Sequence, residues 1–250
     1  MNLISPESGH RRRLVTCVAI LLIWAALPAQ AAEPVHLELV LAADGSGSID
    51  EEELRLQRAG YAQAITDPRV LDVMTAGGAS AIALCLIEWG GADSQHTVVD
   101  WTVIRDRASA ERFAEALMAA PRLARGYNSI SGAIDYAAAK IFSNGIEAPR
   151  RVIDVSGDGP QIGGRPVQAA RDDAVAAGIV INALVVKSAG GGYPGPRGEP
   201  LDQHYANDVI GGPGAFVMIA DEETSFADAL INKLIREIAG GPLEVAASGP

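Results

Sequence analysis

The hydrophobic residues of the chain fall into short runs that predict the strands of a sheet. Aliphatic side chains dominate Val35–Ala42, Ala79–Trp89, Arg151–Val155 and Ile179–Val186. Apolar runs of this length are typical of strands that are buried on both faces, as in a parallel sheet. A further run, His96–Val103, alternates between apolar and polar residues. That alternation predicts an antiparallel strand near an edge of the sheet.

Between these runs, apolar positions recur with the spacing of amphipathic helices. The acids at Asp50–Glu53 favour the start of a helix, because negative side chains interact well with the N-terminal end of the helix dipole. We expect Pro68 and Gly77-Gly78 to interrupt the chain before the second strand. The expected helices and the last strand are Asp50–Thr66, Ala110–Ala120 with Ser109 as its cap, Ser129–Phe142, Val167–Ala177, Leu201–Val209, Ser225–Ile238 and the strand Ala215–Ile219. This order predicts an α/β fold, a doubly wound, mostly parallel sheet of about six strands with helices on both faces.

The first residues have the features of a secretion signal. Arg11–Arg13 precede the apolar run Leu14–Ala26, and Ala29–Ala31 supplies a cleavage site of small residues. The apolar run is shorter than the roughly 20 residues that a membrane-spanning helix needs. We therefore expect residues 1–31 to be a signal peptide, residues 32–240 to form one domain and residues 241–250 to be a short C-terminal tail. The expected location is periplasmic or secreted, with no membrane span after cleavage.

The balance of charge narrows the classes of partner. The chain has 20 Lys and Arg against 31 Asp and Glu, and loss of residues 1–31 would change its net charge from −11 to −13. An acidic surface of this kind disfavours nucleic acid and anionic membranes as partners. Cys85 is the one cysteine after residue 31, and it lies within an apolar run. This position predicts a buried, inert thiol and no internal disulfide.

An acid and two hydroxyls follow the first predicted strand at alternate positions. Asp44, Ser46 and Ser48 are separated by Gly45 and Gly47. Glycine permits a tight bend of the backbone, so the three oxygen-bearing side chains can turn toward one point. Carboxylate and hydroxyl oxygens suit a hard cation such as Mg2+, Mn2+ or Ca2+. The pattern predicts a metal site at the carboxyl end of this strand.

A second acid occupies an equivalent place after the fourth predicted strand. Asp158 follows Arg151–Val155, in the sequence Ser-Gly-Asp-Gly-Pro. In doubly wound sheets, ligands bind outside the carboxyl ends of the strands. We therefore expect Asp158 to lie at the same edge of the sheet as Asp44, more than a hundred positions earlier in the chain.

The stretch Asp44–Ser48 resembles the Asp-x-Ser-x-Ser signature of von Willebrand factor A domains. In that family the signature is the first part of a metal-ion-dependent adhesion site. An Asp followed by Gly after the fourth strand is the third part, which Asp158-Gly159 matches. The second part is a Thr in a Gly-rich turn that opens a helix. The corresponding stretch here is Gly126–Ile134, which has Asn128 at the Thr position and Ser129 next to it.

The resemblance extends over most of the chain, because the order of the predicted elements agrees with the family from about Val35 to Ala239. Ile153–Gly159 and Val209–Phe216 are similar to an exported bacterial branch of the family whose function is uncharacterised. The resemblance implies a binding module, not an enzyme, that captures a protein partner through the metal. An acidic side chain of the partner would complete the coordination of the ion. The implied metal ligands are Asp44, Ser46, Ser48, Asp158 and either Asn128 or Ser129.

Three other interpretations use the same residues. The loop that ends at Glu53 is similar to an EF-hand loop, but Ala42 stands where the first acid is expected and a strand precedes it. A strand-end Asp can also be the nucleophile of a metal-dependent hydrolase or phosphatase, although Ser46 stands where that chemistry usually has a second acid. A structural module with a vestigial metal site is the third interpretation. The sequence contains no G-x-S-x-G, H-E-x-x-H or P-loop motif, which favours a binding protein.

The other residues with possible chemistry predict structural roles. The histidines do not have the spacing of metal ligands, and the favoured interpretation is that each is exposed or hydrogen-bonded. Glu88 and Asp154 are acids in or beside predicted strands, which favours buried ion pairs or a supporting role at the metal. The aromatic residues Trp89, Trp101 and Tyr193 are expected to pack in the core or in loops.

Overall fold

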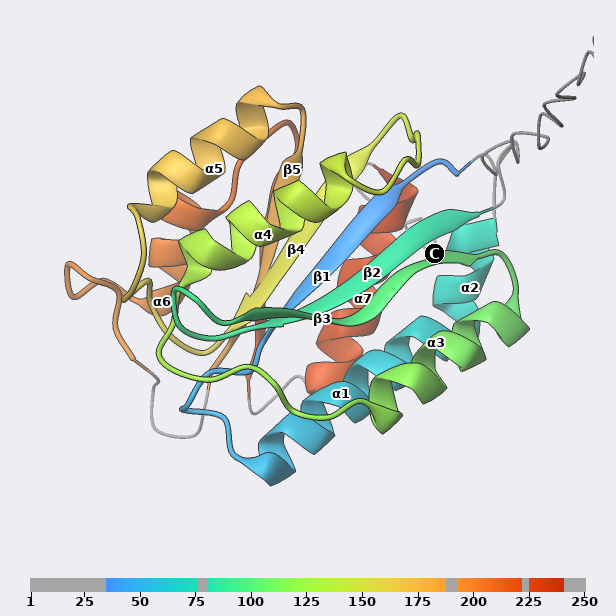
Figure 1. Ribbon diagram of the computed structural model, residues 1–250, viewed down its shortest axis with the longest axis horizontal. Coiled ribbons are helices and arrows are strands. Elements are labelled where there is room, and N and C mark those ends of the chain that lie inside the picture. Colours follow the sequence, from blue (N-terminus) through green and yellow to red (C-terminus); the bar gives the residue numbers. More distant parts are fainter. Residues whose placement is uncertain (1–34, 76–80, 188–192, 222–224, 241–250) are drawn as a thin grey trace, which may run out of the picture. The chain divides into compact units, whose positions relative to one another are not determined.

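The computed structural model describes residues 35–75, 81–187, 193–221 and 225–240 (Figure 1). The expected signal peptide, residues 1–31, and the expected tail, residues 241–250, lie outside the described residues. Among the helices that are described, none is both long and apolar enough to cross a lipid bilayer. All the described residues belong to one compact unit of the chain, Ala32–Pro250.

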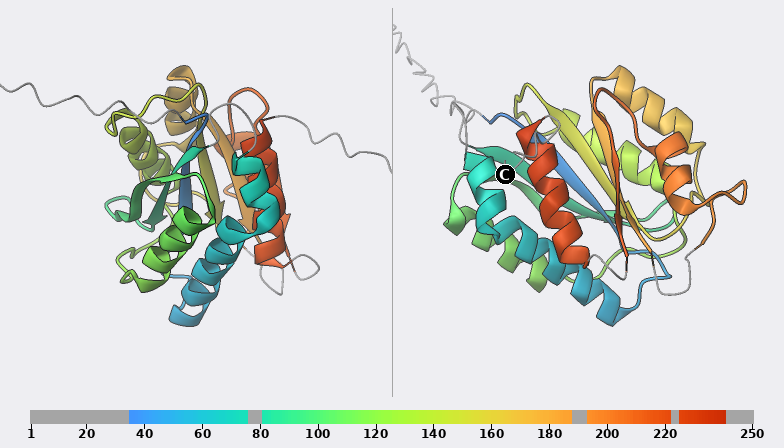
Figure 2. Two further views of the ribbon diagram at one scale, coloured as in Figure 1. Left: turned by 90° about the vertical axis from the view of Figure 1, so that its right-hand side faces the viewer. Right: turned by 180° about the vertical axis from the view of Figure 1, so that it is seen from behind.

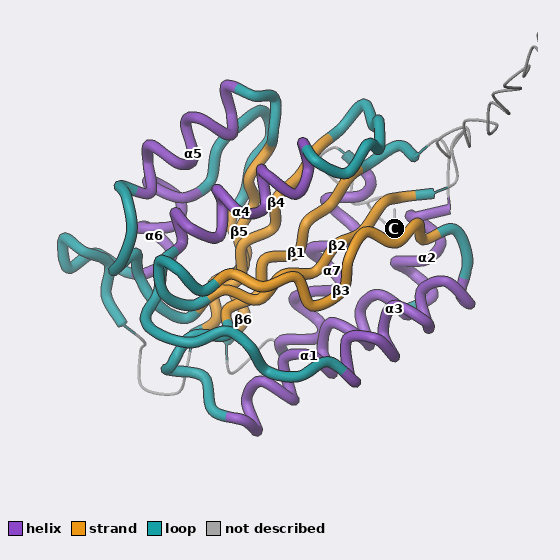
Figure 3. Tube along the Cα trace, viewed as in Figure 1, coloured by secondary structure: helices purple, strands orange, loops and turns teal. Residues whose placement is uncertain are grey.

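A six-stranded sheet forms the centre of this unit (Figure 3). Its strands are β1 (Glu38–Asp44), β2 (Ile82–Trp89), β3 (Gln95–Ile104), β4 (Arg151–Gly157), β5 (Val180–Val186) and β6 (Val217–Ala220). They lie in the order β3-β2-β1-β4-β5-β6. β3 is antiparallel to β2 at one edge, and the other neighbouring pairs are parallel. The predicted mostly parallel sheet with an antiparallel edge strand is confirmed.

Helices cover both faces of the sheet, as the views in Figure 2 show. The helices on one face are α1 (Glu51–Thr66), α2 (Pro68–Thr75), α3 (Arg107–Ala119) and α7 (Phe226–Ala239). Those on the other face are α4 (Ile130–Phe142), α5 (Val167–Ala176) and α6 (Leu201–His204), which continues into a π-helical turn, Tyr205–Val209. This arrangement confirms the doubly wound fold.

The side chains of β1 show why neither face can be left open. Leu39 and Leu41 point into the hydrophobic core beneath α1 and α7, and they are fully buried. Val40 and Ala42 alternate with them and are fully buried in the core beneath α4 and α5. Successive side chains of a strand point to opposite faces, so a strand covered on both sides is apolar throughout.

Three local expectations are wrong. Pro68 does not interrupt the chain but is the first residue of α2, where the N–H that proline lacks would have no helical partner. Ser109 is not the cap of α3: Asp106 is the cap, and Ser109 is the third helical residue of a capping box with it. The last strand covers Val217–Ala220 and not Ala215–Ile219.

Candidate metal centre

The site lies where the order of the strands reverses. β2 is on one side of β1 and β4 is on the other, so the chain leaves the carboxyl ends of β1 and β4 toward opposite faces. Asp44 is the last residue of β1, and Asp158 directly follows β4. Ala43 pairs with Ser156 in the parallel register, which places the two acids on adjacent strand ends. Crevices at such reversal points are the usual ligand sites of open α/β sheets.

The predicted residues of the first loop and Asp158 form one chain of hydrogen bonds. The backbone N–H of Ser46 donates to Asp44 Oδ1 at 2.8 Å. The hydroxyls of Ser46 and Ser48 are 3.0 Å apart. Ser48 Oγ donates to Asp158 Oδ1 at 3.3 Å. The structure therefore brings Asp44, Ser46, Ser48 and Asp158 together, as the sequence predicted.

The two carboxyl groups of this site carry charge that the described residues do not neutralise. Asp44 is buried, and its second oxygen, Oδ2, accepts no hydrogen bond from any described group. Burial, followed by repulsion from Asp158, raises the pKa of Asp44 to about 7. Burial also raises the pKa of Asp158. A cation between these oxygens would remove both penalties, so the residues present fit a divalent metal ion.

Asn128 and Ser129 have different roles at the edge of this site. Asn128 is buried, and its Nδ2 lies so close to Gly159 that it leaves no room for a Cβ atom at that position. Ser129 is the N-cap of α4, and its Oγ accepts a hydrogen bond from Gly132 N at 3.2 Å. The amide of Asn128 is thus next to the Asp158 loop, while the hydroxyl of Ser129 is engaged at the start of a helix.

Arg122 holds the first loop in place, and the sequence did not indicate this role. Its guanidinium donates to the backbone oxygens of Ile49 at 2.6 Å and Ser46 at 3.0 Å. Gly47 N donates to Gly126 O at 2.8 Å, which adds a second link between the loop and the segment before α4. No local pattern around Arg122 distinguishes it from other loop arginines, because its partners lie more than seventy positions earlier.

The acids that follow the loop belong to α1. Asp50 caps this helix, accepting from Glu52 N and Glu53 N, and Glu53 Oε2 accepts a hydrogen bond from the backbone N–H of Asp50. This capping box satisfies the free N–H groups at the helix start. The EF-hand interpretation is wrong, because β1 leads into the loop where an EF-hand has a helix.

A second group of possible ligand atoms lies behind the site, where the sequence predicted none. Atoms of Glu199, His204 and Asp208 are all within 4.8 Å of one another. His204 Nε2 accepts from Gln161 N at 3.3 Å, so its Nδ1 carries the proton and donates to Asp208 Oδ2 at 2.8 Å. Arg197 also contacts Asp208 at 2.7 Å and Glu199 at 3.1 Å. Arg197 supplies one positive charge beside the two carboxylates, and His204 links this group to Gln161 in the loop after Asp158.

Most of the other predicted structural roles agree with the structure. Glu88 forms a buried ion pair with Arg58 at 2.7 Å. Asp154 forms one with Lys233 at 2.5 Å. Cys85 is buried and free, and burial raises its pKa to about 12. Trp89 is buried in the core as expected, but the expectation of packing is wrong for Tyr193, which is 63% exposed.

Comparisons with known proteins agree with the fold. Residues 34–242 match the family described as "Protein of unknown function (DUF1194)". A search of curated proteins found no match. One similar solved structure is proximal thread matrix protein 1 from the mussel byssus with a zinc-occupied MIDAS motif, at 15% identity and a TM-score of 0.56, covering 83% of this chain and 46% of that chain.

Two bacterial structures are also similar. The von Willebrand factor type A protein from Catenulispora acidiphila has 15% identity and a TM-score of 0.53, covering 82% of this chain and 42% of that chain. The pilus adhesin SpaC from Lactobacillus rhamnosus GG has 15% identity and a TM-score of 0.56, and the match covers 84% of this chain and 30% of that chain. The chain spans less than half the length of each of these three structures. The chain belongs to the DUF1194 family and has the fold of von Willebrand factor A domains.

Proposed function

We propose that this protein is an exported binding module of the adhesion type, which captures a protein partner through a divalent cation at the carboxyl edge of its sheet. The observation that carries the proposal is the convergence of Asp44 and Asp158, with Asp44 Oδ2 buried and unpartnered among the described residues. A buried acid in this state is neutralised either by a proton or by a counter-charge, and the counter-charge is needed once the pH exceeds the raised pKa of about 7. Mg2+ is the proposed ion, with Mn2+ or Ca2+ as substitutes.

The ligand set supports capture of a partner and not mere structural binding of the ion. Ser46 and Ser48 would be neutral ligands, Asp44 and Asp158 would supply the negative charge, and Asn128 lies beside them. Few anionic ligands leave a bound cation able to accept a further carboxylate, so we propose an acidic side chain of the partner as that ligand. Among proteins of similar fold, SpaC is a pilus adhesin, and the mussel matrix protein has a zinc-occupied MIDAS motif.

Exposed apolar side chains around the site support a protein as the partner. Tyr127 precedes Asn128 and is 73% exposed, and Ile162, whose N–H donates to Asn128 O, is 64% exposed. Leu56 is 54% exposed and lines a cavity of about 190 Å3 that also includes Asp44 and Asp158. Large apolar side chains around a polar centre are typical of protein interfaces.

Direct titration of metal into the chelator-treated protein tests the proposal. We expect saturable binding of Mn2+, competed by Mg2+, and a loss of affinity of tenfold or more in Asp158→Asn. Glu111→Gln is the matched control, because Glu111 is 52% exposed on α3 and lies in a long ion pair of 3.8 Å. Absence of saturable binding to the wild type would refute the metal site.

Capture of a partner is tested separately. The protein is immobilised and exposed to envelope proteins of the producing cell, with Mg2+ or with EDTA. We expect a partner that is retained only with Mg2+ and only by proteins that keep Asp158. A partner that EDTA does not release would contradict capture through the ion, while leaving metal binding itself intact.

A further inference from the structure

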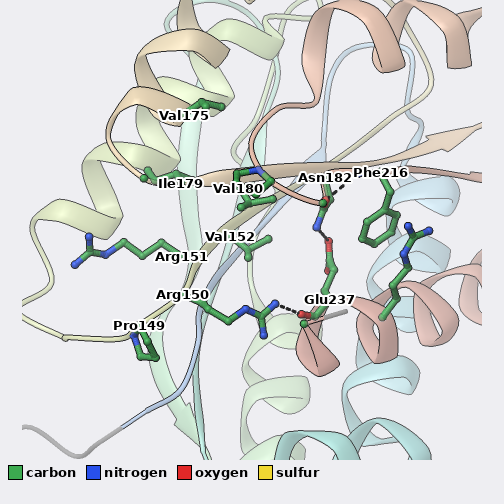
Figure 4. Close-up of a pocket in the computed structure, with 15 residues that line it drawn as sticks. Pro149, Arg150, Arg151, Val152, Val175, Ile179, Val180, Asn182, Phe216 and Glu237 are labelled. Atoms are coloured by element: carbon green, nitrogen blue, oxygen red, sulfur yellow. Dashed lines mark hydrogen bonds between the residues drawn. The ribbon is translucent and has the colours of Figure 1, made fainter. Parts of the chain in front are cut away.

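Figure 4 shows the residues that line a larger cavity. This cavity lies at the opposite end of the sheet from the proposed metal centre. Its volume is about 680 Å3, within the range of small-molecule sites in proteins. It is formed where β4 and β5 begin, before β6, and beside the last turn of α7. Aliphatic and aromatic side chains form much of its wall, namely Val152, Val175, Ile179, Val180 and Phe216.

Arg150 contributes a cation to the wall of this cavity, which Glu237 also lines. Its guanidinium donates to Ile238 O at 2.9 Å and to Glu237 O, both backbone oxygens at the end of α7. These bonds leave further N–H donors of the guanidinium available, and no ion pair joins Arg150 to a described acid. Burial lowers the pKa of Arg150, and the nearby charge of Glu237 offsets only part of this effect.

Arg236 contributes a second cation from α7. Its guanidinium lies 3.8 Å from the centre of the Phe216 ring, a stacked arrangement that fixes its position. It forms no ion pair with any carboxylate that the structure describes. Lys233 also approaches the Phe216 ring, but its ammonium group forms ion pairs with Asp154 and Glu237. Neither Arg150 nor Arg236 therefore forms an ion pair with a carboxylate in the described part of the chain, and each guanidinium is oriented by other contacts.

This is unusual in a chain with a net charge of −11. Elsewhere in the described structure most arginines pair with acids, as in Arg58–Glu88, Arg122–Glu51, Arg165–Asp135, Arg171–Asp172 and Arg197–Asp208. At the cavity, backbone oxygens and an aromatic ring take the place of carboxylates. A guanidinium that is oriented but not neutralised is well suited to bind an anion, because its planar donors match carboxylate and phosphate oxygens.

We propose that this cavity binds a small amphiphilic anion, with a carboxylate or phosphate head held by Arg150 and Arg236 and an apolar body against Val175, Ile179 and Val180. The cavity is open to such a ligand without rearrangement of the sheet, since it is already present between the strand ends and α7. The site is independent of the metal centre, which lies at the other end of the strands.

Octanoate and octyl phosphate are the probes, titrated into the full chain in the presence of EDTA. We expect saturable binding of at least one of them by calorimetry, and a rise in Tm of about 5 °C or more at a hundredfold excess over Kd. Octanol tests the need for the charge, and inorganic phosphate tests the need for the apolar body. Binding of either as tightly as the matching octyl anion would overturn the proposal, as would no saturable binding of octanoate or octyl phosphate.

Variants locate the site. Arg236→Gln is expected to weaken binding tenfold or more, and Val175→Glu, on a partly exposed wall residue, is expected to abolish it. Arg107→Gln is the matched control, because Arg107 is 56% exposed on α3 and far along the chain from the cavity. Asp158→Asn should bind the anion like the wild type, which separates this site from the proposed metal centre. Unchanged binding by both cavity variants would show that the anion binds elsewhere.

Discussion

Two pairs of acids meet in this protein, one at the edge of the sheet and one in its interior. At the edge, Asp44 and Asp158 come together after β1 and β4. In the interior, Asp154 of β4 and Glu237 of α7 meet beneath the sheet. Burial and mutual repulsion raise the pKa of Asp44 and of Glu237, each to about 7. In both pairs, therefore, burial of two neighbouring carboxyl groups makes their charged forms unfavourable.

The difference lies in the source of the compensating charge. Lys233 lies 2.5 Å from both Asp154 and Glu237, so the interior pair receives its cation from the chain itself. Among the described residues, no lysine or arginine forms an ion pair with Asp44 or Asp158. An interior pair must be neutralised during folding, whereas a pair beside the exposed Ser48 can be neutralised by an ion from solution. The comparison supports the proposal that the edge pair binds an ion, and it assigns a structural role to the interior pair.

Removal of the internal cation gives the largest expected effect. Lys233→Met leaves two acids buried without a counter-charge, and we expect the free energy of unfolding to fall by about 3–5 kcal/mol at pH 8. The loss should be smaller at pH 5, because protonated acids need no counter-ion. Urea denaturation at the two pH values measures both effects.

Lys140→Met is the control for that variant. Lys140 also forms a short ion pair, 2.6 Å from Asp100, but Asp100 is 70% exposed. Exposed pairs contribute at most about 1 kcal/mol. An equal loss of stability in the two variants would contradict the structural role assigned to Lys233.

The edge pair should respond in the opposite direction. Asp44→Asn removes a buried charge, so in EDTA at pH 8 we expect it to raise the free energy of unfolding by about 2–4 kcal/mol. In the wild type without metal, burial holds the pKa of Asp44 at about 7 in the folded state, whereas its pKa in the unfolded chain is 3.8, the ordinary value of an aspartate. Stability contributed by this group therefore falls as the pH rises from about 4 to about 7.

Thermal unfolding with and without Mg2+ measures this difference. Mg2+ should stabilise the wild type at pH 8 and have no effect on Asp44→Asn, because the variant lacks one of the two charges that bind the ion. The affinity of the wild type for the metal should also decrease as the pH is lowered, since the proton and the ion compete for the same carboxylates. A variant that is less stable than the wild type in EDTA would show that Asp44 is already neutralised within the chain.

Loss of the hydrogen bonds that hold the loop after β1 should give the smallest effect. Arg122→Gln removes the bonds to Ile49 O and Ser46 O without changing any proposed ligand. We expect a loss of metal affinity of about tenfold, typical of residues that position a metal ligand. Calorimetric titration of Mn2+ into this variant and into Arg107→Gln compares the two. Equal affinities would mean that the loop holds its shape without Arg122.

The strands and the edge site were predictable because their signals are local. Apolar runs such as Val35–Ala42 indicate a strand that is buried on both faces. Asp44, Ser46 and Ser48 lie within five consecutive residues. Asp158 was placed at the same edge by a general property of parallel sheets. The start of α2 was missed because proline occurs both at the first position of a helix and in segments that interrupt regular structure, so Pro68 alone does not distinguish the two.

By itself the sequence determined the layers of the fold, the convergence of Asp44 and Asp158 at the carboxyl edge of the sheet, and the burial of Cys85. Only the tertiary structure decided which charges are compensated. Lys233 reaches Asp154 from nearly eighty positions later, and Arg122 reaches Ile49 from more than seventy positions later. The physical reason is that hydrophobic periodicity depends on residues that are close in the sequence. The pairing of a charge depends instead on which groups the completed fold brings within a few ångströms of it.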